Sequence, residues 1–79
     1  MNAEKLVYMA NQIANFFRTQ ADEAAVAGVA DHIRSFWNPA MRRDIYAHLR
    51  AGGEGLEPLA RRGLEALMAR DGAAARDVT

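Results

Sequence analysis

The fold is decided by residues 6–17, LVYMANQIANFF. The large apolar side chains of this stretch share one stripe of a helix with 3.6 residues per turn: Leu6, Met9, Ile13, Phe16 and Phe17. This spacing predicts a first helix over about residues 3–19. Nothing in the rest of the chain alternates with a period of two for long enough to form a strand, so we expect an all-α protein.

A second helix is predicted over about residues 23–37, where apolar side chains repeat the same spacing. The side chain of Asp22 can accept hydrogen bonds from free backbone N–H groups, so we expect it to be the N-cap. Gly28 lies inside this helix, where glycine costs up to about 1 kcal/mol relative to alanine. Its position therefore predicts a close approach to the aromatic end of the first helix.

A third helix is predicted over about residues 39–50. It begins at Asn38-Pro39, which combines a capping side chain with a residue that is tolerated at the first helical position. It ends at Gly52-Gly53, because glycine adopts the left-handed conformation without steric cost. The direction of the chain is expected to change at Asn38-Pro39.

A fourth helix is predicted over about residues 58–70, stopped by Asp71-Gly72. Short loops favour antiparallel neighbours, so we expect an N-terminal helical hairpin with two shorter helices packed across it. This small four-helix domain would occupy residues 1–72. Residues 73–79 have too little apolar surface to dock and are expected to form a disordered tail.

The composition excludes several classes of function. Ten Lys and Arg balance ten Asp and Glu, whereas nucleic-acid binding normally requires clustered cations. The chain has no cysteine, which removes thiolate catalysis, iron–sulfur ligation and cysteine-type zinc sites. The longest uncharged run, residues 6–17, is shorter than the roughly 20 apolar residues of a membrane span, and no signal peptide is visible. We expect a cytoplasmic protein that binds neither nucleic acid nor membranes.

Side chains that could carry chemistry are few. His32 and His48 lie on different predicted helices, without the spacing of a helical zinc site, so no metal site is expected. Ser35 is the only serine, and a nucleophile needs a base and an oxyanion site in a cleft, which four short helices rarely provide. We therefore expect no catalytic, metal-binding or cofactor-binding residue, and no enzyme activity from this chain alone.

Two adjacent aromatic pairs, Phe16-Phe17 and Phe36-Trp37, are more informative. Neighbours on a helix differ by about 100° in direction, so if one member of a pair faces the core, the other points away from it. One residue of each pair is therefore expected to be free for other contacts. For Trp37 two interpretations stay open, core packing and anchoring on a partner, because tryptophan is enriched at interface hot spots.

Two longer strings carry a family resemblance: residues 6–17 and residues 31–42, DHIRSFWNPAMR. Together with Gly52-Gly53 and the segment GLEPL at 55–59, they make the chain similar to the delta subunit of NAD-dependent, molybdenum-containing formate dehydrogenases. The resemblance covers about residues 5–70. It implies a small accessory subunit of a soluble complex that oxidises formate to carbon dioxide and reduces NAD.

The resemblance also implies where the chemistry of the complex lies. In such enzymes the alpha subunit carries bis-molybdopterin guanine dinucleotide and iron–sulfur clusters, the beta subunit holds FMN and the NAD site, and a gamma subunit adds a further cluster. The delta subunit has no known cofactor. It is expected to sit against the alpha subunit and to support its assembly or cofactor retention.

Three hypotheses follow for this chain. As an accessory subunit, it would dock through an edge of aromatic and polar side chains: Asn11, Gln12, Phe17, Arg34, Trp37, Arg42 and Arg43. As a dissociable maturation chaperone, it would bind the guanine dinucleotide cofactor or another nucleotide through Arg42, Arg43 and neighbouring helix ends. As a helical homodimeric regulator, it would show a mass that depends on concentration.

Overall fold

The computed structural model describes the backbone of residues 2–78 and the side chains of residues 2–72. It contains four helices, which follow one another along the chain: α1 (Ala3–Phe17), α2 (Asp22–Phe36), α3 (Pro39–Arg50) and α4 (Pro58–Val78). The backbone of residues 2–78 contains no strand. The predicted all-α, four-helix fold is therefore confirmed.

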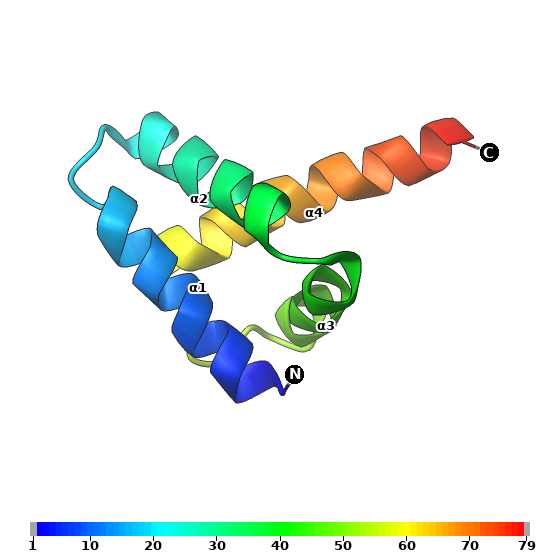
Figure 1. The fold of residues 1–79 in the computed structure, drawn as a ribbon, viewed down its shortest axis with the longest axis horizontal. Helices are drawn as coiled ribbons and strands as arrows, with labels where there is room; N and C mark the ends of the chain where they lie inside the picture. Colours follow the sequence, from blue (N-terminus) through cyan, green and yellow to red (C-terminus); the bar gives the residue numbers. More distant parts are fainter. Residues whose placement is uncertain (1, 79) are drawn as a thin grey trace.

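The first two helices form the expected hairpin, and they diverge from the loop that joins them (Figure 1). α4 runs behind this hairpin and packs most extensively against α2, while α3 lies across the open end (Figure 1). The close packing of α2 on α4 depends on Gly63, because a Cβ atom at that position would clash with Cγ1 of Val29. The hairpin is thus packed against both α3 and α4.

The hydrophobic core lies where all four helices meet. Its largest fully buried side chains come from every helix: Leu6, Val29, Ile33, Ile45, Leu64 and Leu67. Trp37 at the end of α2 joins this core with only 5% of its surface exposed. Met9 and Met41 pack against the edge of the same cluster. Of the two interpretations open for Trp37, the structure selects core packing.

Side-chain caps start two of the helices. Oδ1 of Asn38 accepts a hydrogen bond of 2.9 Å from the N–H of Met41, and Pro39 follows it, so the predicted start of α3 is confirmed. The predicted cap of α2 is wrong, because Ala21 occupies the N-cap and Asp22 is the first helical residue. The Asp22 carboxylate instead accepts a hydrogen bond of 2.7 Å from Arg62 on α4. This bond and the charge of Arg62 lower the pKa of Asp22.

The predicted end of α3 agrees with the structure, whereas the predicted end of α4 does not. Gly52 and Gly53 have φ angles of 122° and 67° and end α3 as predicted. Gly72 does not adopt a left-handed φ, so no stop forms there, and α4 continues to Val78 as the longest helix. Glycine within a helix costs only about 1 kcal/mol relative to alanine, which the continued helix can absorb. The expected disordered tail, residues 73–79, falls outside the residues whose side chains are described.

Candidate interaction surface

The hairpin of α1 and α2 is held at its closed end by an aromatic ring against a glycine. A Cβ atom at Gly28 would lie 2.5 Å from Cδ1 and 2.6 Å from Cε1 of Phe17, so the ring occupies the space that any larger residue would need. The predicted approach of Gly28 to the aromatic end of α1 is therefore confirmed. Phe17 is partly buried as a result, and its ring forms one end of a groove between the two helices.

We call this depression the α1–α2 groove. It consists of two adjoining hollows of about 320 and 340 Å³. The first is lined by Gln12, Ile13, Phe16, Phe17 and His32. The second is lined by Tyr8, Met9, Gln12, Ile13, His32, Phe36, Trp37 and Met41. The two hollows share three residues, so they form one continuous feature along α1.

Three large apolar side chains at the groove remain exposed to solvent. Phe16 is 76% exposed, Phe36 is 73% exposed and Tyr8 is 64% exposed. The Phe16 ring meets Phe17 edge to face, with ring centroids 5.1 Å apart, and Phe36 stacks on His32 at 4.5 Å. The expectation of one free residue in each aromatic pair is thus confirmed, with Phe16 and Phe36 as the free members.

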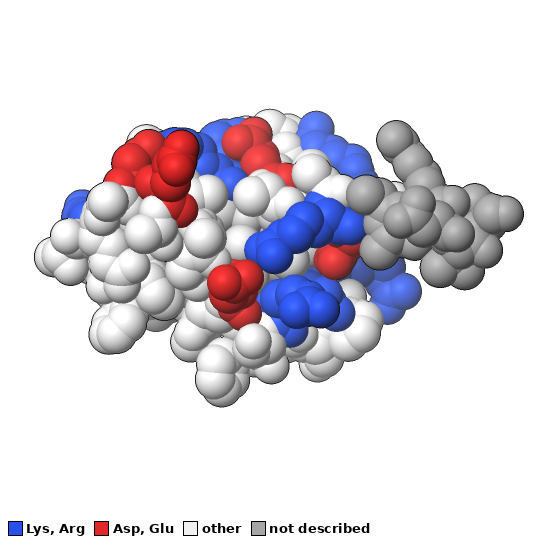
Figure 2. All heavy atoms as spheres, turned by 90° about the horizontal axis from the view of Figure 1, so that it is seen from above, with Lys and Arg blue, Asp and Glu red and all other residues white. Residues whose placement is uncertain are grey.

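The groove is also almost free of charge. His32 is the only titratable side chain among its lining residues besides the phenol of Tyr8. Charged residues gather elsewhere, as in the ion pairs Arg62–Asp22 and Arg70–Asp31, which join α4 to α2. Figure 2 shows positive and negative side chains interspersed over one part of the face that it draws, with an uncharged margin below them. The groove therefore presents apolar surface without a charged partner for a ligand.

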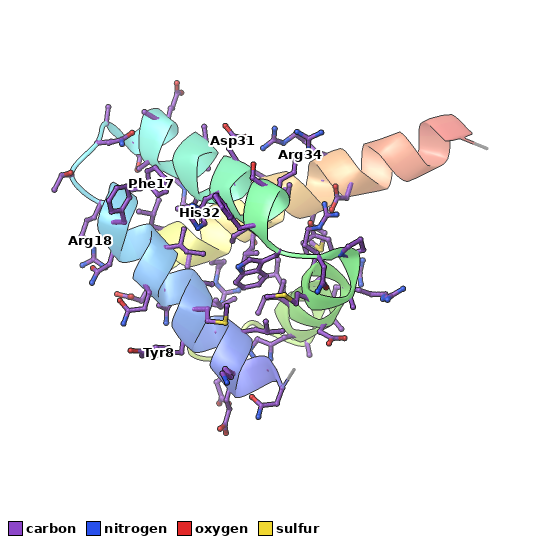
Figure 3. The ribbon with its side chains drawn as sticks, viewed as in Figure 1. Tyr8, Phe17, Arg18, Asp31, His32 and Arg34 are labelled. Atoms are coloured by element: carbon purple, nitrogen blue, oxygen red, sulfur yellow. The ribbon has the colours of Figure 1, made fainter. Side chains whose placement is uncertain are left out.

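Three of the seven sequence-predicted docking residues, Gln12, Phe17 and Trp37, line this groove. Nε2 of Gln12 donates a hydrogen bond of 2.8 Å to the Tyr8 hydroxyl one turn earlier on α1, and both residues line the second hollow. Figure 3 shows Phe17 and His32 between the two helices. Trp37 contributes to the floor of the groove as a buried core residue rather than as an exposed anchor.

Asn11 has a structural role that the sequence did not indicate. Its Nδ2 donates a hydrogen bond of 3.0 Å to the carbonyl oxygen of Gly55, and its Oδ1 accepts one of 3.0 Å from the N–H of Glu57. Both ends of one amide therefore hold the loop between α3 and α4 against α1. The polar groups of Asn11 are thus engaged within the chain, and its place on the docking edge stays a prediction.

The three predicted docking arginines lie away from the groove. Arg34 is exposed on the side of α2 that faces away from α1 (Figure 3). Arg42 and Arg43 line a separate hollow at the α3–α4 contact. The seven predicted residues thus do not share one face, because helical phase separates Arg34 from Phe36 on α2, and Arg42 and Arg43 belong to α3.

A hydrogen-bonded cluster joins α3 to α4 at that second hollow. The Tyr46 hydroxyl donates to Oδ2 of Asp71, and Nη1 of Arg42 lies 3.4 Å from the same oxygen. Burial of the Tyr46 ring raises the pKa of its phenol, and the hydrogen bond to Asp71 raises it further. The guanidinium of Arg42 is therefore already paired with a carboxylate of this chain.

Among the side chains of residues 2–72, no group of three His, Asp or Glu residues is placed to hold a metal ion. None of the described helices combines the length and apolar character that a bilayer crossing requires.

Comparison with known proteins identifies the family of the chain. Residues 5–64 match the family model described as the NADH-dependent formate dehydrogenase delta subunit FdsD. No curated protein and no solved structure matches the chain. The matched range includes all of α2 and α3 and most of α1, and therefore both helices that form the groove. Because the match covers well over half of the sequence, the chain belongs to the delta-subunit family of NADH-dependent formate dehydrogenases.

Proposed function

We propose that this chain is a non-catalytic accessory subunit that docks on the large alpha subunit of a cytoplasmic formate dehydrogenase. The observation that supports the proposal most directly is the uncharged groove with its exposed aromatic side chains. The family description, which names a subunit of formate dehydrogenase, indicates what kind of partner would cover it. Phe16 and Phe36 project from it with about three quarters of their surface exposed. Exposed aromatic side chains of this kind are typical of surfaces that bind another protein.

In the proposed complex, the redox chemistry lies in the other subunits. The alpha subunit would carry bis-molybdopterin guanine dinucleotide and iron–sulfur clusters, the beta subunit FMN and the NAD site, and the gamma subunit a further cluster. The delta subunit would contribute binding energy rather than a turnover step. A subunit that binds only the folded, cofactor-loaded alpha subunit stabilises it by about 2.7 kcal/mol when present at a hundredfold excess over the dissociation constant. Docking would thereby support assembly or cofactor retention.

The alternative of a chaperone that binds a guanine nucleotide is less well supported. It depends on Arg42 and Arg43 as phosphate contacts. Arg42 lies 3.4 Å from the carboxylate of Asp71, and a phosphate entering that hollow would meet this negative charge. The anion-binding interpretation therefore requires the Arg42–Asp71 pair to break first.

A pull-down of the tagged full-length chain from cells that contain the complete enzyme tests the proposal. We expect the alpha subunit to co-elute at equal copy number, with molybdenum and iron detected by metal analysis and the complex seen by native mass spectrometry. Recovery of only a cofactor-free alpha subunit would instead identify a maturation factor. A mass that rises with concentration and contains only this chain would identify a homodimer.

A further inference from the structure

We infer that the docking site is the α1–α2 groove and that its occupant is one amphipathic helix of the partner subunit. This inference rests on the proposed function and specifies its surface. The occupant would insert uncharged apolar side chains, spaced two helical turns apart, into the two hollows. The surface differs from the edge predicted by sequence, because it is centred on Phe16 and Phe36 and excludes the arginines.

The spacing of the hollows supports a helical occupant. One hollow is bounded by Phe16 and Phe17 and the other by Tyr8 and Met9, which are eight residues earlier on α1. At 1.5 Å per residue, this separation is about 12 Å. Residues i and i+7 of a helix are about 10.5 Å apart on one face, so they match the two hollows, with a residue at i+3 or i+4 passing over Ile13.

The backbone at the groove favours a helix over an extended segment. A bound strand gains most of its affinity by hydrogen bonding to the free edge of a sheet. Both walls of this groove are helices, whose backbone groups are already paired within the helix. Affinity must therefore come from side-chain packing, for which an amphipathic helix presents a continuous apolar face.

The absence of charge at the groove sets the chemistry of the inserted side chains. A charged side chain placed between Phe16, Phe36 and Ile13 would lose water without gaining a partner of opposite charge among the lining residues. Leucine, isoleucine, methionine or phenylalanine would instead bury the exposed rings at no electrostatic cost. The occupant is thus expected to carry its charges on the face directed away from the groove.

The exposed area argues against a second copy of this chain as the occupant. Aromatic side chains bury roughly 200 Å² each, so the exposed fractions of Tyr8, Phe16 and Phe36 amount to about 400 Å². Two copies paired through these rings would bury about 800 Å², which is below the roughly 1,200–2,000 Å² of a stable interface. A helix from a larger subunit can cover the rings while its parent domain adds further contact area.

Site-specific photo-cross-linking within the complete enzyme tests this inference. A benzophenone amino acid is placed at position 16 or 36 of the full-length chain, and at Ala69 as the control, which is exposed on α4. We expect positions 16 and 36 to cross-link to a single segment of a formate dehydrogenase subunit with apolar residues at i, i+3 or i+4, and i+7. Position 69 is expected to give at most a tenth of that yield.

Charge insertion gives a second, independent readout. Phe16→Asp and Phe36→Asp are expected to lower the recovery of the complex at least tenfold, while helical circular dichroism of the variant chain is retained because both side chains are exposed. Ala69→Asp, which adds the same charge on α4 outside the groove lining, is expected to leave recovery unchanged. Normal recovery of both groove variants would overturn the inference.

The outcomes separate the inference from the proposed function. If the alpha subunit co-purifies while cross-links form at position 69 and not in the groove, the inference fails and the proposed function stands. Cross-links between two copies of this chain would overturn the heterologous occupant. If no formate dehydrogenase subunit co-purifies with the unaltered chain, the proposed function itself fails, and the inference fails with it.

Discussion

The ring of Phe17 lies directly over Gly28, so that a Cβ atom at Gly28 would lie 2.5 Å from Cδ1 of that ring. This contact joins α1 to α2 near the loop between them. The same ring lines the first hollow of the α1–α2 groove. One residue without a side chain therefore affects both the stability of the hairpin and the shape of the proposed docking surface.

Gly28→Ala is expected to destabilise the protein even though alanine is the better helix former. The helix propensity gain of about 1 kcal/mol is opposed by the clash with Phe17, since overpacking costs typically 1–3 kcal/mol. We expect a net loss of up to about 2 kcal/mol in the free energy of unfolding, measured by chemical denaturation. Gly72→Ala is the matched control, because nothing lies within 4 Å of its new Cβ atom, and it should be neutral or stabilising.

Asn11→Ala is expected to loosen the loop between α3 and α4. It removes the hydrogen bonds to the carbonyl oxygen of Gly55 and from the N–H of Glu57, each 3.0 Å long. The bond from the Glu57 N–H is partly buried, and leaving such a donor without a partner costs about 1–3 kcal/mol, so the free energy of unfolding in denaturant should fall by that amount. Asn15→Ala, on the exposed side of the same helix, is the control. Equal stability of the two variants would contradict the role of Asn11.

Much of the fold could be predicted because its signals are local. The apolar stripe of residues 6–17 and the Asn38-Pro39 start each depend on neighbours within one or two turns, and the structure confirms both. The end of α4 could not be predicted in this way. Asp71-Gly72 resembles a helix stop, but the Asp71 carboxylate is held by Tyr46 of α3, a contact that the local sequence does not reveal.

The proposed docking surface was harder to predict than the fold. The aromatic pairs indicated that one ring of each would be free, but adjacent residues differ by only about 100° and the sequence did not identify which. Tertiary packing decides which ring is free, because the Phe17 ring packs against Gly28 and Trp37 is buried in the core. A polar residue such as Asn11 likewise looks the same whether it faces a partner or its own loop.

Trp37→Ala is expected to unfold the protein rather than to weaken docking selectively. Trp37 is 95% buried, and truncating a buried tryptophan costs about 3–5 kcal/mol. A single core of this size supplies only about 3–5 kcal/mol in total, so the helical circular dichroism signal should be largely lost. Phe36→Ala removes the neighbouring aromatic ring, which is 73% exposed, and should retain that signal. A folded Trp37→Ala variant would contradict the core assignment.

Tyr46→Phe is expected to reduce stability at neutral pH and to flatten its decline at alkaline pH. At pH 7 the loss of the hydrogen bond to Asp71 should cost about 0.5–1.5 kcal/mol. Burial and this bond raise the pKa of Tyr46 above its usual value of about 10, so the unfolded chain releases the proton first. The contribution of Tyr46 is therefore complete below pH 10 and lost as the pH rises further. The test is to measure the free energy of unfolding of the unaltered protein and of Tyr46→Phe between pH 7 and 11. If the two curves run parallel, the phenol of Tyr46 titrates equally in the folded and unfolded states, which would contradict the prediction.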